Sequence, residues 1–206
     1  MNTKVLSWST MKLSIAGTVD CTSSEGPGDR FALWVQGCSI RCPNCCNPQM
    51  FVQKKPTMDV SLLAEQVIAA RVKIPTLEGI TIIGGEPFEQ AKALTSLCKT
   101  IRPLWPDASF SVMVFTGYQI SELQKNKTHR DFLDEIDLLI DGPFDKSRPE
   151  ILFKNRRWIG SSNQQIHFLT ARYLALKNNW PIGKNTVELK IKNGVVSING
   201  FPFPNL

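Results

Sequence analysis

The sequence lacks several features that would place it in other classes of protein. It has no apolar run long enough to cross a membrane, and residues 1–10 lack the apolar core of a signal peptide. Its six cysteines, three of them clustered, fit a reducing compartment and metal ligation better than a disulfide framework. We therefore expect a protein of the cytoplasm, with no membrane association.

A continuous basic stripe is also missing. The formal net charge is +6, but the basic residues are dispersed, and Lys54–Lys55 and Arg156–Arg157 are the only adjacent pairs. Aromatic residues are not interleaved with basic ones, as they are in many nucleic-acid-binding segments. The charge is therefore interpreted as that of a solvated surface, and nucleic acid is not expected as a partner.

What the sequence does contain is a compact group of thiols, Cys38, Cys42 and Cys45, after the apolar run 31–35, which predicts a strand. Thiolates are the soft ligands that iron–sulfur clusters and zinc select. Four irons held by three cysteines leave one iron open to a substrate. A zinc knuckle, with Cys46 or Cys21 as its fourth ligand, is the alternative, although structural zinc sites usually combine two separated ligand pairs and no second pair is present.

This C-x3-C-x2-C spacing matches the signature of the radical S-adenosylmethionine (SAM) enzymes. The wider stretch 29–48 resembles the activating proteins of anaerobic (class III) ribonucleotide reductases. Most radical SAM proteins have an aromatic residue before the third cysteine, where this chain has Asn44, and the activating proteins similarly have a small residue there. They commonly place an aromatic residue after that cysteine, where this chain has Cys46.

A second motif, Gly84-Gly85-Glu86-Pro87, follows the apolar run 80–83. Two glycines let the backbone approach a ligand closely, and the Glu86 carboxylate can accept hydrogen bonds from an ammonium group. Alone, these residues could form an ordinary strand-to-helix turn. The resemblance implies that they hold the amino group of SAM.

Two further motifs follow later strands, of which Thr116-Gly117-Tyr118 is the weaker and Asp141-Gly142-Pro143-Phe144 is the more specific to the activating proteins. Thr116, in Thr116-Gly117-Tyr118, resembles the stretch that flanks the SAM site. For Asp141, in Asp141-Gly142-Pro143-Phe144, the alternatives are direct binding of SAM, binding through a cation, and capping of the turn. Residues 160–164 also resemble a stretch of the longer members of this family, for which the sequence suggests no role.

Strand and helix patterns alternate along the first part of the chain, which predicts an α/β fold with a parallel sheet. Among the predicted elements are a helix at 60–72, a strand at 111–115 and a helical stretch at 120–136 that can break at its polar middle. The polar motifs should then meet at the carboxyl ends of the strands. The resemblance implies an incomplete, partial β/α barrel of the radical SAM type over residues 1–150. We expect residues 151–206 to form a C-terminal extension that packs on this core in a single domain and includes a hairpin of residues 187–191 and 195–198, turning at 193–194.

The resemblance implies a radical SAM activase. Cys38, Cys42 and Cys45 would be the catalytic and metal-binding residues that hold a [4Fe–4S] cluster, while Gly84, Gly85, Glu86, Thr116 and Asp141 would bind SAM. Reductive cleavage of SAM would produce a 5′-deoxyadenosyl radical that removes a hydrogen atom from a glycine of an anaerobic ribonucleotide reductase. A one-electron donor such as flavodoxin would supply the electron. The alternatives are a radical SAM enzyme acting on another glycyl radical enzyme, a peptide or a small molecule, and a non-catalytic metal-binding interaction module.

Overall fold

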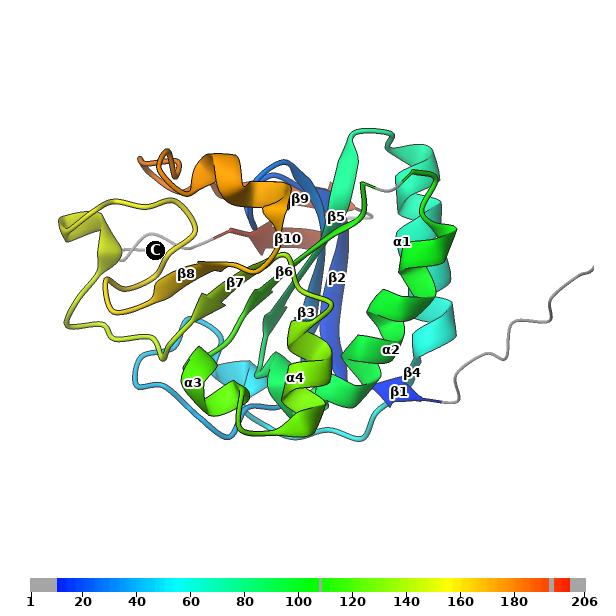
Figure 1. Ribbon diagram of the computed structural model, residues 1–206, viewed down its shortest axis with the longest axis horizontal. Coiled ribbons are helices and arrows are strands. Elements are labelled where there is room, and N and C mark those ends of the chain that lie inside the picture. The colour runs from blue at the N-terminus through cyan, green and yellow to red at the C-terminus, as the bar shows by residue number, and fades with distance from the viewer. Residues whose placement is uncertain (1–10, 108, 193–194, 201–206) are drawn as a thin grey trace, which may run out of the picture.

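The computed structural model describes residues 11–107, 109–192 and 195–200. A mixed sheet forms its centre (Figure 1), with the strand order β2-β3-β5-β6-β7-β8. The inner strands β3, β5, β6 and β7 are parallel, and the two outer strands pair antiparallel to their neighbours. The strand bounds are Ile15–Thr22 (β2), Asp29–Val35 (β3), Leu77–Gly84 (β5), Ser111–Phe115 (β6), Leu138–Asp141 (β7) and Gln165–Phe168 (β8). The predicted α/β class is confirmed.

Helices cover one face of this sheet (Figure 1): α1 (Val60–Lys73), α2 (Ala91–Ile101) and α4 (Lys127–Leu133). Leu63 and Val67 of α1 pack in one core cluster with the alternate strand residues Ile80 and Ile82. The predicted break in the helical stretch 120–136 is confirmed. The stretch divides into α3 (Ile120–Leu123) and α4, and the side chain of Asn126 accepts hydrogen bonds from the first amides of α4.

The opposite face of the sheet carries a second apolar cluster. Met113 belongs to this cluster, whereas its neighbours Val112 and Val114 belong to the helix side, because successive strand residues point to opposite faces. Tyr173, from the 3-10 helix η5 (Ala171–Leu176), also packs here. The extension thus contributes both an outer strand, β8, and part of the packing on this face.

Two small antiparallel pairs complete the described chain. β1 (Lys12–Leu13) pairs with β4 (Met58–Asp59), and β9 (Glu188–Lys192) pairs with β10 (Val195–Asn199). The predicted C-terminal hairpin is therefore confirmed, with bounds shifted by one residue, while its predicted turn at 193–194 lies outside the described residues. None of the helices within the described ranges combines the length and the apolar character that crossing a membrane requires.

Candidate active site

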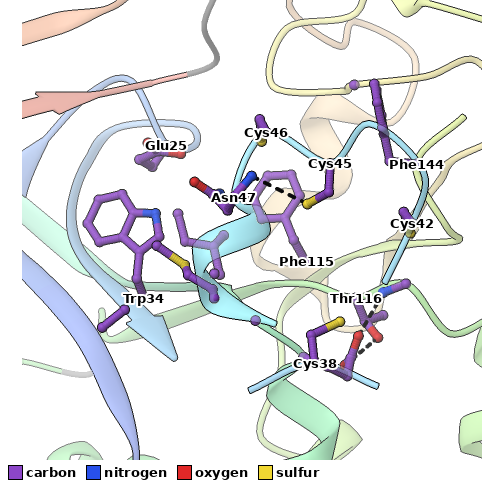
Figure 2. A pocket seen from close by; sticks show the side chains of 18 of the residues that line it. Glu25, Trp34, Cys38, Cys42, Cys45, Cys46, Asn47, Phe115, Thr116 and Phe144 are labelled. Carbon is purple, nitrogen blue, oxygen red and sulfur yellow. Dashed lines mark hydrogen bonds between the residues drawn. The ribbon is translucent and has the colours of Figure 1, made fainter. Parts of the chain in front are cut away.

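A cavity of about 550 Å³ lies where the inner strands of the sheet end. Figure 2 shows that side chains from several separate segments point into it. The loops that follow β3, β5, β6 and β7 all contribute, as expected of a parallel sheet. Among its lining residues are Cys38, Cys42, Cys45, Gly84, Gly85, Glu86, Thr116, Gly117 and Gly142.

The loop that carries the three cysteines is held in place by backbone and amide hydrogen bonds. The Gln36 side chain donates to the carbonyl oxygens of Gln49 (3.2 Å) and Val52 (2.7 Å), which closes the loop on itself. Asn44 has a φ of 59°, a left-handed conformation that asparagine adopts more readily than most residues. This conformation gives a physical reason for an asparagine at the position where most radical SAM proteins have an aromatic residue.

All three cysteine sulfurs receive hydrogen bonds from backbone amides. The amides of Ile40 and Arg41 donate to Cys38, and the amide of Phe144 donates to Cys42. The amide of Asn47 lies 3.4 Å from the Cys45 sulfur (Figure 2). Amide donors stabilise a thiolate, the form in which cysteine binds metal.

The thiols differ in how readily they ionise. Burial raises the pKa of Cys38 and of Cys42, and the amides that contact each sulfur oppose this rise. The hydrogen bond from Cys46 lowers the pKa of the Cys45 thiol and raises that of Cys46. Cys46 therefore supports the thiolate of Cys45 as a neighbour.

The cysteine geometry suits a group larger than one ion. A tetrahedral zinc ion would bring its sulfur ligands within about 4 Å of one another, because each Zn–S bond is about 2.3 Å long. Within the described ranges, no three Cys, His, Asp or Glu side chains converge in this way. Three thiols that line one cavity, each with an amide donor, provide the donor set of a [4Fe–4S] cluster, which cysteines bind at separate irons.

The two glycines of the second motif pack against the cysteine loop. The Gly85 amide donates to the Val35 carbonyl (2.7 Å), and the Glu86 amide donates to the Gly37 carbonyl (2.8 Å). A Cβ atom on Gly85 would overlap the backbone of Gly37, and Gly84 has a φ of 106°. The glycines therefore let this motif approach the backbone of residues 35–37, while their predicted approach to a ligand stays a prediction.

Glu86 joins two of the predicted motifs. Its side chain is buried, with Oε1 accepting from the Phe88 amide (2.9 Å) and the Thr116 hydroxyl (2.8 Å), and Oε2 accepting from the Gly117 amide (2.9 Å). Burial raises the pKa of Glu86 to about 7, although these donors oppose the rise. Because Oε2 has one donor among the described residues, it retains the capacity to accept a hydrogen bond from an ammonium group.

Asp141 is not among the residues that line the cavity. Its carboxylate accepts a hydrogen bond from the Ile120 amide at the start of α3 (2.7 Å) and lies 3.0 Å from Nε2 of His167. Burial would raise the pKa of Asp141, but the His167 ring and the Ile120 amide hold it below its usual value. These contacts fit the capping alternative. Asp141 lies beside the segment that carries Thr116, because Phe115 pairs with Ile140 and the Gly142 amide donates to the Tyr118 carbonyl (3.0 Å), and its binding to SAM stays a prediction.

Aromatic residues to which the sequence assigned no role in the site also line the cavity, among them Trp34, Phe115 and Phe144 (Figure 2). Strand periodicity could have placed the first two. Leu33 and Val35 face the helices, so Trp34 between them points to the opposite face, and Phe115 follows Val114 in the same way. The C-terminal extension also reaches the cavity, which it lines with Trp158, Gly160 and Gln164. No periodic pattern in the sequence could have placed these three residues there.

The comparisons with known proteins agree on one family. Residues 24–167 match the family described as a 4Fe-4S single cluster domain. The chain is 32% identical over 153 residues to the anaerobic ribonucleoside-triphosphate reductase-activating protein of Escherichia coli (strain K12), a match covering 70% of this chain and 92% of that protein. The activating proteins of Pasteurella multocida (strain Pm70; 32% over 155 residues, 71% of this chain and 91% of that protein) and Enterobacteria phage T4 (24% over 148 residues, 71% and 88%) are also similar. The chain therefore belongs to the family of the anaerobic ribonucleoside-triphosphate reductase-activating proteins and carries its 4Fe-4S single cluster domain.

Proposed function

We propose that this protein is a radical SAM activase that generates a glycyl radical on an anaerobic ribonucleoside-triphosphate reductase. The observation that carries the proposal is that Cys38, Cys42 and Cys45 line one cavity together with Glu86. When bound, a [4Fe–4S] cluster supplies the electron that cleaves SAM into methionine and a 5′-deoxyadenosyl radical. The residues of the chain hold the reactants, orient them and exclude water.

The three cysteines would hold the cluster as thiolates. The amides of Ile40, Arg41, Phe144 and Asn47 stabilise that form and orient the sulfurs. Three cysteine ligands would leave one iron of the cluster available to SAM, which the cavity beside the cysteines can receive.

Glu86 would receive the ammonium group of SAM. Its Oε2 atom carries the unused acceptor capacity, and the Thr116 hydroxyl and the Phe88 amide fix the carboxylate in one orientation. An ammonium group beside Glu86 favours the carboxylate form and lowers the pKa that burial has raised. Trp34, Phe115 and Phe144 would limit the access of water to the reacting atoms.

The proposal also includes the barrel fold, the partners and the location that the sequence predicted. The six-stranded sheet, with β2 and β8 as its outer strands, supports an incomplete barrel of the radical SAM type. The reductase is the proposed protein substrate because the relatives are named as its activating proteins. Flavodoxin is the proposed electron donor and the cytoplasm the proposed location, which flavodoxin-driven turnover and cell fractionation would test.

The test is anaerobic reconstitution with iron and sulfide, reduction with dithionite, and assay of 5′-deoxyadenosine formed from SAM. We expect product that depends on both iron and reductant, and a glycyl radical signal by electron paramagnetic resonance once the reductase is added. Cys42→Ala should abolish both, whereas Cys21→Ala, outside the cavity lining, should retain them. Cleavage of SAM by the Cys42→Ala protein would refute the ligand assignment. Product without a glycyl radical would point to another substrate.

A further inference from the structure

Residues 160–164, for which the sequence suggested no role, make direct contacts with residues 142–145. We call these segments the anchor turn and the cavity loop. We propose that the anchor turn is a positioning element that fixes the cavity loop and, through its Phe144 amide, the sulfur of Cys42. The part of this inference that concerns a bound cluster rests on the proposed function.

Three side chains of the anchor turn bind three backbone groups of the cavity loop. Nε2 of Gln164 donates to the Gly142 carbonyl (3.1 Å), and Nδ2 of Asn163 donates to the Pro143 carbonyl (2.7 Å). The Asp145 amide donates to the Ser161 hydroxyl (3.0 Å). The cavity loop follows β7 without regular secondary structure, so these side chains satisfy polar groups that a strand or helix would otherwise satisfy.

The orientation of the Gln164 amide is set by its own oxygen. Oε1 accepts from the amides of Gly160 (3.0 Å) and Ser161 (3.2 Å), which directs Nε2 toward the cavity loop. Both amides therefore lie on the acceptor side of the side chain. One glutamine thus closes the anchor turn and contacts the loop beside it.

A buried ion pair holds the anchor turn from behind. Arg156 makes two hydrogen bonds to the carboxylate of Glu150, at 2.7 and 2.8 Å, and also donates to the Gln164 carbonyl (3.1 Å). Glu150 is 2% exposed and Ser161 is fully buried. A two-point pair of this kind restricts both side chains, so the turn rests on a rigid base.

The cavity loop connects this anchor to the cysteines. The Phe144 amide donates to the Cys42 sulfur, and Phe144 lies beside Cys42 and Cys45 in the cavity (Figure 2). Hydrogen bonds to ligand sulfurs help to set the reduction potential of iron–sulfur clusters. Displacing the Phe144 amide should therefore make a bound cluster harder to reduce, without a change in any ligand.

Two isosteric variants test this inference. Asn163→Asp and Gln164→Glu each replace an N–H donor with an oxygen that faces a loop carbonyl. The matched control is Gln165→Glu, which adds the same charge at the next residue, where the side chain is exposed. Amide hydrogen exchange at residues 144–145 is measured on the cluster-free chain, and the midpoint potential is measured after reconstitution.

We expect exchange at residues 144–145 to accelerate roughly threefold to tenfold in both variants, the range that loss of one hydrogen bond allows. The equilibrium for cluster reduction should fall by a similar factor, so that the midpoint potential becomes more negative. Gln165→Glu should change neither quantity. If Gln164→Glu fails to fold, Asn163→Asp, which removes a single contact, decides the outcome.

Unchanged exchange at residues 144–145 in Asn163→Asp would overturn the anchoring role. Faster exchange with an unchanged midpoint potential would overturn the link to Cys42. A wild-type chain that binds no iron would refute the proposed function instead, and with it the cluster part of this inference. The exchange measurement needs no cluster and would still decide whether the turn holds the loop.

Discussion

Replacing Tyr173 by phenylalanine tests how the C-terminal extension is joined to the core. The Tyr173 hydroxyl lies 2.9 Å from Nη1 of Arg30 and 2.9 Å from the Ser111 hydroxyl. The Ser111 hydroxyl can donate its hydrogen to the Glu78 carbonyl (3.0 Å), in which case Tyr173 accepts from Arg30 and donates to Ser111. One hydroxyl from the extension thus completes a hydrogen-bond network between β3 and β6.

The free energy of unfolding that Tyr173→Phe should lose follows from the burial of Arg30. Its side chain is fully buried, and the acceptors around it are neutral: Thr81, Ser111, Tyr173 and the Ile80 carbonyl. Burial lowers the pKa of Arg30, and the hydrogen bonds to these acceptors offset the free-energy cost of burying its charge. A hydrogen bond to a charged group contributes about 1.5–3 kcal/mol. Because Nη1 also donates to Ser111 (2.5 Å), we expect Tyr173→Phe to cost about 2 kcal/mol, within that range.

Urea unfolding followed by circular dichroism measures this loss of free energy. In a chain of this size, about 2 kcal/mol should lower the melting temperature by roughly 4–8 °C. Tyr118→Phe is the matched control, since its hydroxyl makes no hydrogen bond to any residue in the described ranges. A loss below about 0.5 kcal/mol, the range of an ordinary surface substitution, would refute the reasoning about Arg30. A separate early transition for the extension would contradict the proposal of a single domain.

Three further perturbations have defined outcomes. Gly85→Ala should destabilise the chain by about 1–3 kcal/mol in urea unfolding because its Cβ overlaps the Gly37 backbone, whereas Gly17→Ala, with nothing within 4 Å, should cost less than that. For Glu86, the pKa rises from 4.5 to about 7 in the folded state. Its contribution to the free energy of unfolding is therefore most favourable below pH 4.5 and weakens by about 3 kcal/mol as the pH rises to 7. Glu86→Gln should reduce this dependence of stability on pH, and an unchanged dependence would contradict the assignment. Glu25, whose pKa burial also raises to about 7, should retain its own slope in that variant. Glu150 behaves in the opposite sense: Arg156 holds its pKa low despite burial, so its stabilisation is present above pH 4.5 and is lost in acid. Melting curves should show Glu150→Gln less stable near neutral pH and less sensitive to acid, and equal acid sensitivity would exclude this role.

The sequence predicted elements well where local pattern and tertiary packing agree. The apolar run 111–115 forms β6 with the predicted bounds, and the helix predicted at 60–72 is α1, which extends to Lys73. Four consecutive residues of β6 are buried, and in α1 the apolar residues Leu63 and Val67 enter the core, whereas Leu62 is 51% exposed. The break near Asn126 was also predictable, because this residue caps a helix more readily than it continues one.

Contacts between segments that lie far apart in the chain could not be predicted from the sequence. Asp141 follows an apolar strand, and its sequence neighbours do not reveal which donor will face it. The partner is His167 of β8, brought near by the antiparallel register that pairs Leu139 with His167 and Asp141 with Gln165. A four-residue outer strand carries too few alternations for its register to be predicted. The same limitation hid the contacts of the anchor turn, which depend on where β8 pairs.

The two strongest sequence motifs form one structural unit. The backbone of Gly85 and Glu86 bonds to Val35 and Gly37, so the second motif supports the chain directly before Cys38. Gly84 pairs with Val35 across β3 and β5, which places the ends of both motifs at the same level of the sheet. A side chain at Gly85 would separate them. The glycines therefore do more than leave space near a ligand, because they let the segment bearing Glu86 and the segment bearing the cysteines share one set of hydrogen bonds. A change in either motif should consequently disturb the other, which gives a physical reason why the pair together identifies the site more strongly than either motif alone.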